Sequence, residues 1–150
     1  MTTLLGRGSG LTPAGDDLLA GALAGLRALD SPAADDLGTV VRALAPRGTT
    51  RLSAALLEAA DVAAVVPEAA GVLRALAGAG DVEAAAGRLV DLGHTSGWHL
   101  AAGLLVGVTH AGAGARDAET VPALEGGGNR RPGTPVRAPA GRPVAPRRAS

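Results

Sequence analysis

The chain has 150 residues, which suits one domain better than two, and its 14 basic residues, all arginine, balance 14 acidic ones. The absence of cysteine excludes disulfides and thiolate metal sites. Hydrophobic residues make up 47% but aromatic residues only 1%, so Ala, Leu and Val must form the core, a composition that favours helices over strands.

Apolar residues recur at helical spacing from about residue 16 to about residue 110 and predict a run of helices. The first should begin with Thr12 as N-cap and Pro13 in the first turn. Ser31 and Pro32 should begin the second helix, and Pro46 should stop it. The later helices are expected to begin at Thr50, Pro67, Asp81 and Ser96, and the last to end near residue 108. These elements predict an all-α, compact bundle of about six short helices.

Two pairs of glycines, each spaced by four residues, occur in the first and last predicted helices. They are Gly21 with Gly25, and Gly103 with Gly107. Glycines at this spacing share a helix face and let two helices approach closely. These two helices also have the most apolar faces, so we expect them to form the central pair of the bundle.

The composition changes near Gly112, beyond which Gly, Pro, Ala and Arg dominate. We therefore predict a helical domain over residues 1–111 and a disordered tail over 112–150. Residues 111–150 carry seven arginines against three acids, whereas residues 1–110 carry seven against eleven. A basic tail can touch nucleic acid or an acidic partner, but we interpret this one as solvated and expect no nucleic-acid binding.

No targeting or membrane segment is evident in the sequence. Residues 1–5 lack a basic region followed by a long apolar run. The most apolar stretch, 98–108, is far shorter than the roughly 20 residues that span a bilayer. We therefore expect a cytoplasmic protein that does not enter a membrane.

The first polar segment, residues 6–17, places three alternating glycines before a predicted helix start. Glycine leaves the backbone free to take positive φ angles and to approach a ligand closely. Exposed N–H groups at a helix start favour anions, and an arginine adds a guanidinium suited to phosphate or carboxylate. The alternative is a tight turn with a purely structural role. The candidate substrate-binding residues of this segment are Gly6, Arg7, Gly8, Gly10 and Thr12.

Two adjacent carboxylates, Asp16 and Asp17, end this segment. In the first turn of a helix they interact favourably with the positive end of the helix dipole, but they repel phosphate. A divalent ion such as Mg²⁺ or Mn²⁺ would reconcile the two, because carboxylate and phosphate oxygens often share it. The alternative is that both acids only stabilise the helix start. We predict a metal at this pair and no other cofactor.

The second polar segment, residues 93–99, gathers two histidines and the only Trp before the most apolar helix. Histidine is the side chain best suited to proton transfer near neutral pH, so His94 is the candidate general acid/base or amide-binding donor. The alternative is an ordinary capped helix start with one packed Trp. The candidate substrate-binding residues here are Thr95, Ser96 and Trp98. A middle segment is a candidate third wall of a pocket through Thr49, Thr50, Arg51 and Ser53.

The residue types, order and spacing of these segments resemble the AllH-like family. Its Gly-x-Gly-x-Gly-Leu-Thr-Pro-Ser-Gly-Asp-Asp segment corresponds to residues 6–17, with Ala14 in place of the usual Ser. Its Gly-His-Thr/Ser-Ser-Gly-Trp segment corresponds to residues 93–98, and residues 49–53 resemble its middle polar segment. The resemblance covers about residues 4–110 and corresponds to the C-terminal part of the family.

This resemblance implies a subunit of a heteromeric oxamate carbamoyltransferase in purine (allantoin) breakdown. That reaction interconverts oxalurate plus phosphate with oxamate plus carbamoyl phosphate. Partners would be the other carbamoyltransferase subunits and a small anionic ligand, bound in a pocket between the two polar segments. A non-catalytic scaffold and a truncated remnant of the family are the alternatives.

Overall fold

A computed structural model describes residues 4–120 of the chain, and the side chains of residues 4–116. Within that part the chain forms six helices and no strand, which confirms the all-α prediction. The helices are α1 (Ala14–Ala28), α2 (Ala33–Gly48), α3 (Arg51–Asp61), α4 (Pro67–Leu76), α5 (Val82–Val90) and α6 (Ser96–Thr120). No helix among these residues is long and apolar enough to cross a membrane.

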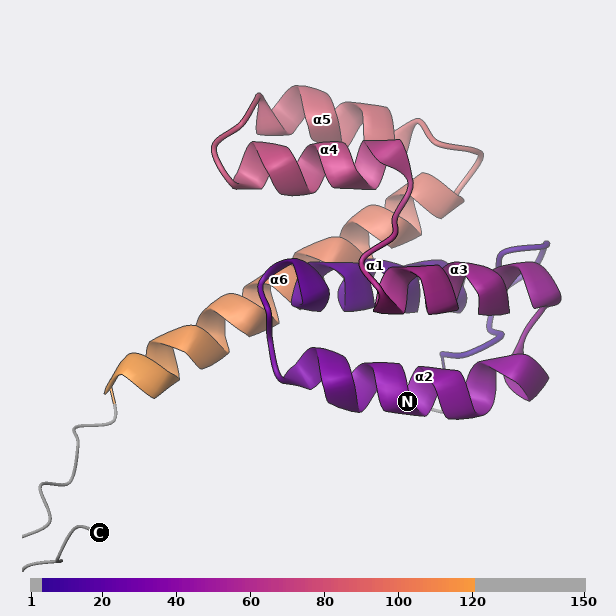
Figure 1. The fold of residues 1–150 in the computed structure, drawn as a ribbon. Helices are drawn as coiled ribbons and strands as arrows, with labels where there is room; N and C mark the ends of the chain where they lie inside the picture. The colour runs from indigo at the N-terminus through magenta and orange to yellow at the C-terminus, as the bar shows by residue number, and fades with distance from the viewer. Residues whose placement is uncertain (1–3, 121–150) are drawn as a thin grey trace, which may run out of the picture.

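Helices α1 and α6 cross at the centre of the bundle (Figure 1). Helices α2 and α3 lie on one side of this pair, and the antiparallel hairpin of α4 and α5 lies on the other. The core accordingly has two clusters, one around Leu23 and Leu57 and the other around Leu89 and Leu104. Leu100 of α6 packs against both clusters and joins them.

The two glycine pairs lie where α1 meets α6, as the sequence predicted. A Cβ at Gly21 would overlap the Leu100 carbonyl oxygen, and one at Gly103 would overlap the Leu18 carbonyl oxygen. Gly25 and Gly107 make similarly close approaches one turn further along each helix. The two backbones therefore touch directly, and the prediction of a central helix pair is confirmed.

Several predicted helix starts are confirmed. The Thr50 side chain accepts a hydrogen bond from the Ser53 N–H at 3.1 Å. The Asp81 carboxylate accepts one from the Ala84 N–H at 3.1 Å. Pro67 is the first residue of α4. Each feature satisfies or removes an N–H group that would otherwise lack a partner at a helix start.

Three expected helix boundaries are wrong by one or two residues. Pro13, not Thr12, is the N-cap of α1, and no side chain caps that helix, because the Thr12 hydroxyl contacts Ser96 instead. Ser31 does not cap α2 with its side chain, although its carbonyl accepts from the Ala34 N–H. Pro46 lies inside α2, which ends two residues later, so the proline disturbs only the last turn.

Helix α6 also ends later than expected. It continues past residue 108 and past Gly112 to Thr120, so no break falls at the expected boundary between residues 111 and 112. Ala111, Ala113 and Ala115 are strong helix formers that outweigh the intervening glycines. The rest of the predicted tail, residues 121–150, lies outside the described residues.

Candidate functional site

The two predicted polar segments meet at one end of the bundle. The side-chain oxygens of Thr12 and Ser96 lie 3.0 Å apart, although the two residues are 84 positions apart in the sequence. Thr12 ends the glycine-rich loop before α1, and Ser96 begins α6. This hydrogen bond therefore links the starts of the two central helices.

The middle polar segment joins them at the start of α3. The Thr50 hydroxyl donates to the Leu11 carbonyl at 2.6 Å, and the Ser53 hydroxyl donates to the same oxygen at 3.5 Å. Helices α1, α3 and α6 thus begin close together, and the positive ends of three helix dipoles converge there. This convergence favours the negative charges of Asp16 and Asp17.

Asp16 holds the glycine-rich loop closed. Its side chain is only 2% exposed, and its Oδ1 accepts the Gly6 N–H at 2.7 Å. Its Oδ2 accepts the Thr49 hydroxyl. Gly6 has a φ of 71°, and a Cβ there would overlap the Gly48 carbonyl oxygen. The predicted positive φ is therefore present, but the Gly6 N–H is already donated to Asp16 rather than open to a ligand.

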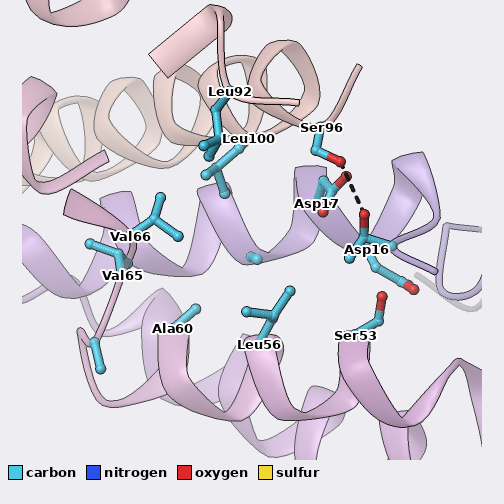
Figure 2. Close-up of a pocket in the computed structure, with 13 residues that line it drawn as sticks. Asp16, Asp17, Ser53, Leu56, Ala60, Val65, Val66, Leu92, Ser96 and Leu100 are labelled. Atoms are coloured by element: carbon cyan, nitrogen blue, oxygen red, sulfur yellow. Dashed lines mark hydrogen bonds between the residues drawn. The ribbon is translucent and has the colours of Figure 1, made fainter. Parts of the chain in front are cut away.

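Asp17 is buried differently. The residue is 8% exposed, and its Oδ2 has no hydrogen-bond partner within the described part of the chain. Burial raises the pKa of this carboxyl above its ordinary value, and the Asp16 charge acts in the same direction. Three other groups act against this increase and lower the pKa of Asp17. They are the hydrogen bond from Ser96, the charge of His99 and the hydrogen bond from the Thr12 hydroxyl. Figure 2 shows the side chains of Asp17 and Ser96 directed toward each other.

These residues close the polar end of a cavity of about 160 Å³ between α1, α3 and α6 (Figure 2). Its walls are apolar and come from Leu56 and Ala60 of α3, the segment before α4, and Leu100. Among the residues with described side chains, no cation lines it. The polar residues of its lining are Thr12, Asp16, Asp17, Ser53 and Ser96.

Other predicted site residues lie outside this cavity. His94 and Thr95 are exposed, and Trp98 is 64% exposed and faces an apolar groove between α4, α5 and α6. The loop residues Arg7, Gly8 and Gly10 are exposed, and both glycines take positive φ angles. The roles assigned to these residues stay predictions.

The metal predicted at Asp16 and Asp17 also stays a prediction. Residues 4–116 contain no group of three or more His, Cys, Asp or Glu side chains that could hold a metal ion. Each Asp16 oxygen already accepts one hydrogen bond, whereas Oδ2 of Asp17 accepts none within the described residues. An ion bound here would need water or ligand oxygens for most of its coordination sphere.

The apolar walls of the cavity were not predicted from the sequence. Val65 and Val66 lie between α3 and α4, and no local pattern distinguishes them from other connecting residues. His99, whose charge acts on Asp17, was not among the residues predicted for the site. Its Nδ1 is buried without a partner in the described region. The signal that could have found it is its position three residues after Ser96, on the same helix face.

Fold and site together define an all-α protein whose glycine-rich loop closes on a buried acidic pair at the end of a small cavity. A protein-family model described as oxamate carbamoyltransferase subunit AllH matches residues 4–108. The chain therefore belongs to the AllH family. No curated protein and no solved structure shows a significant match to the chain.

Proposed function

We propose that the chain is a subunit of an oxamate carbamoyltransferase-type enzyme and that its cavity binds a small carbamoyl or oxamate-type ligand. The observation that carries the proposal is the cavity itself, where three polar segments far apart in the sequence converge. The family membership supplies the reaction class. A role in purine breakdown and a cytoplasmic location, both expected from the sequence, are part of the proposal.

The form of the cavity suits the carbamoyl group. Oxamate, oxalurate and carbamoyl phosphate all carry a planar amide that offers N–H donors and a carbonyl acceptor. A polar end that bears carboxylates and hydroxyls can bind such a group, while apolar walls limit the access of water. The anionic end of the ligand would then point toward the loop, where Arg7 is exposed. His94, also exposed, would act as general acid/base from outside the cavity.

The test is reconstitution with the cognate subunits. The assembled enzyme should form carbamoyl phosphate from oxalurate and phosphate, and Ser96→Ala should lower kcat/KM at least about tenfold, a loss of about 1.4 kcal/mol of transition-state stabilisation. Thr109→Ala, a hydroxyl change further along α6 and outside the cavity lining, is the matched control. His94→Ala tests the acid/base assignment separately. Full activity of Ser96→Ala in an intact assembly would reject the cavity as the site.

A non-catalytic scaffold is the second candidate, and one observation favours it. An open apolar groove of about 700 Å³ lies between α4, α5 and α6, with Trp98 and Leu105 largely exposed in it. Exposed apolar patches of this kind mark contact sites for other proteins. On this hypothesis a partner subunit covers the groove and the polar segments only order the partner's site. Calorimetry decides between the two, because oxamate should bind the chain alone only if the cavity is a ligand site.

A further inference from the structure

The polar end of the cavity holds one hydrogen-bond acceptor that the protein leaves unused. Each oxygen of Asp16 accepts one hydrogen bond, from the Gly6 N–H or from the Thr49 hydroxyl. Oδ2 of Asp17 is buried, lines the cavity and receives no hydrogen bond from any residue that the structure describes. A buried acceptor without a donor is unfavourable, and nearly all such atoms in native proteins are satisfied by protein, water or ligand.

The missing partner is therefore an N–H or O–H donor inside the cavity. A second negative group at this point would meet two carboxylates, and the one side chain whose positive charge acts on Asp17, His99, lies outside the lining. The walls around the polar end are hydrophobic, from Leu56, Ala60 and Leu100. They suit an uncharged ligand better than a strongly hydrated ammonium ion.

The cavity also has a donor for a carbonyl group. The hydroxyls of Thr12 and Ser96 hydrogen-bond each other and Asp17, so their hydrogens are already used. The Ser53 hydroxyl makes only a long bond of 3.5 Å to the Leu11 carbonyl, and it faces the cavity.

We propose that the cavity binds a small primary carboxamide, whose NH2 group donates to Oδ2 of Asp17 while its carbonyl accepts from a neighbouring hydroxyl. The inference rests on the proposed function only for the identity of the physiological ligand. It makes Asp17 the residue that selects an amide over a carboxylate of the same shape.

Two isosteric pairs of probes test this selection on the full chain. In acetate a negatively charged oxygen replaces the NH2 group of acetamide, and oxalate differs from oxamate in the same way. Backbone amide signals in NMR spectra at neutral pH report binding at the starts of α1 and α6. Acetamide should shift the signals of residues around Asp17 and Ser96 in a saturable way, whereas acetate should leave them unchanged. Ammonium chloride should bind more weakly than acetamide.

Asp17→Asn is the main variant, because it removes the negative acceptor with almost no change in shape. It should weaken acetamide binding at least tenfold. Asp35→Asn makes the same chemical change on an exposed residue outside the cavity and should leave acetamide binding unaltered. If Asp17→Asn does not melt cooperatively, Asp17→Ser removes the same acceptor with less bulk and should give the same loss.

The outcomes separate this inference from the proposed function. Acetamide binding that depends on Asp17 without any oxamate binding would retain the inference and reject the proposed function. Oxamate and oxalate bound equally well, with no effect of Asp17→Asn, would retain the proposed function and overturn the inference. The inference is also overturned if acetate or ammonium binds as well as acetamide, or if no probe binds and only water fills the cavity.

Discussion

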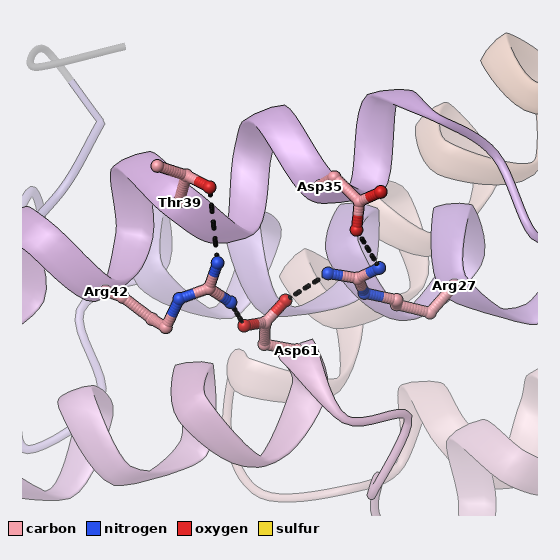
Figure 3. A network of polar contacts seen from close by, with 5 residues as sticks. All are labelled: Arg27, Asp35, Thr39, Arg42 and Asp61. Carbon is pink, nitrogen blue, oxygen red and sulfur yellow. Dashed lines mark hydrogen bonds and ion pairs between the residues drawn. The ribbon is translucent and has the colours of Figure 1, made fainter.

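Two buried aspartates of this bundle have opposite surroundings. Asp61, at the end of α3, is 7% exposed, and its carboxylate pairs with Arg42 and with Arg27, the latter at 2.7 Å. Arg27 also pairs with Asp35 at 2.6 Å (Figure 3). Asp17 is as deeply buried, yet no arginine of the described residues pairs with it and one of its oxygens has no partner.

The difference separates a structural charge from one available to a ligand. A buried carboxylate is costly unless it is paired and hydrogen-bonded. At Asp61 the protein itself supplies both, from α1 and α2, so the network ties three helices together. Gly38 leaves the space, since a Cβ there would overlap Oδ1 of Asp61. At Asp17 no ion pair forms, and helix starts, hydroxyls and the charge of His99 offset the burial only in part, which leaves binding capacity for a ligand.

The largest expected effect comes from breaking the paired carboxylate. Asp61→Asn removes the charge that both arginines bind and should lower the free energy of unfolding by about 2–3 kcal/mol. Urea unfolding followed by circular dichroism measures the change. A loss below about 0.5 kcal/mol would show that the network contributes little and that the two aspartates are energetically alike.

The unpaired carboxylate should respond in the opposite direction. Asp17→Asn should raise the free energy of unfolding near neutral pH by about 1 kcal/mol, because it removes a buried charge that its surroundings compensate only in part. The raised pKa of Asp17 in the folded state sets the pH dependence. Below the ordinary carboxyl pKa the group is neutral in both states, so the cost of its charge is absent.

That cost grows as the pH rises from the ordinary pKa toward the raised one, and it is complete above the latter. The difference in stability between the variant and the wild type should therefore vanish in acid and reach its full value near neutrality. Thermal melts of both proteins from about pH 3 to about pH 7 measure it. A variant that is less stable than the wild type at neutral pH would contradict this account.

A divalent ion is the rival occupant of the same oxygen. If Mg²⁺ or Mn²⁺ binds as the sequence predicts, the gain in stability should stay below about 1 kcal/mol, because only one carboxylate oxygen of the pair is known to be without a hydrogen bond. The gain should disappear in Asp17→Asn and persist in Asp16→Asn, since the Asp16 oxygens are already engaged. Melting temperatures with and without Mg²⁺ test this. An equal change of melting temperature in all three proteins would show that no metal binds at this pair.

The smallest effect is expected at the outer end of the paired network. Asp35 has a side chain that is 79% exposed, and its ion pair with Arg27 lies in water. Asp35→Asn should therefore change the free energy of unfolding by less than about 0.5 kcal/mol. Urea unfolding of Asp35→Asn and Asp61→Asn under the same conditions shows whether the network stabilises the fold through the buried carboxylate or through the outer ion pair. A loss comparable to that of Asp61→Asn would assign it to the outer pair.

Local features of the sequence predicted much of the fold. Helical spacing located all six helices, and Thr50 and Asp81 cap theirs as expected. The pairing of Arg27 with Asp61 was not predicted, because residues 34 positions apart leave no local pattern. The end of α6 was misplaced because composition, rather than helix propensity, set the expected boundary.

The candidate site was predicted only in part. Its polar residues stand out as segments of unusual composition, and the family resemblance linked segments that no periodicity connects. The role of each residue depends on the direction in which its side chain points, and the sequence does not give that direction. Asp16 faces the loop backbone and Asp17 faces the cavity, although the two are adjacent. Adjacent helical residues point about 100° apart, so a small difference in the helix start decides which one meets a ligand.

The direct contact between α1 and α6 fixes the register of the two helices. Gly21 and Gly25 fit against one stretch of α6, while Gly103 and Gly107 fit against one stretch of α1. Sliding α6 by one turn, about 5.4 Å, would place the side chain of His99 where Gly103 now meets the Leu18 carbonyl. Only one alignment is sterically open, and in that alignment the first turns of the two helices stand opposite each other. Four residues without side chains thereby set which groups face each other across the cavity.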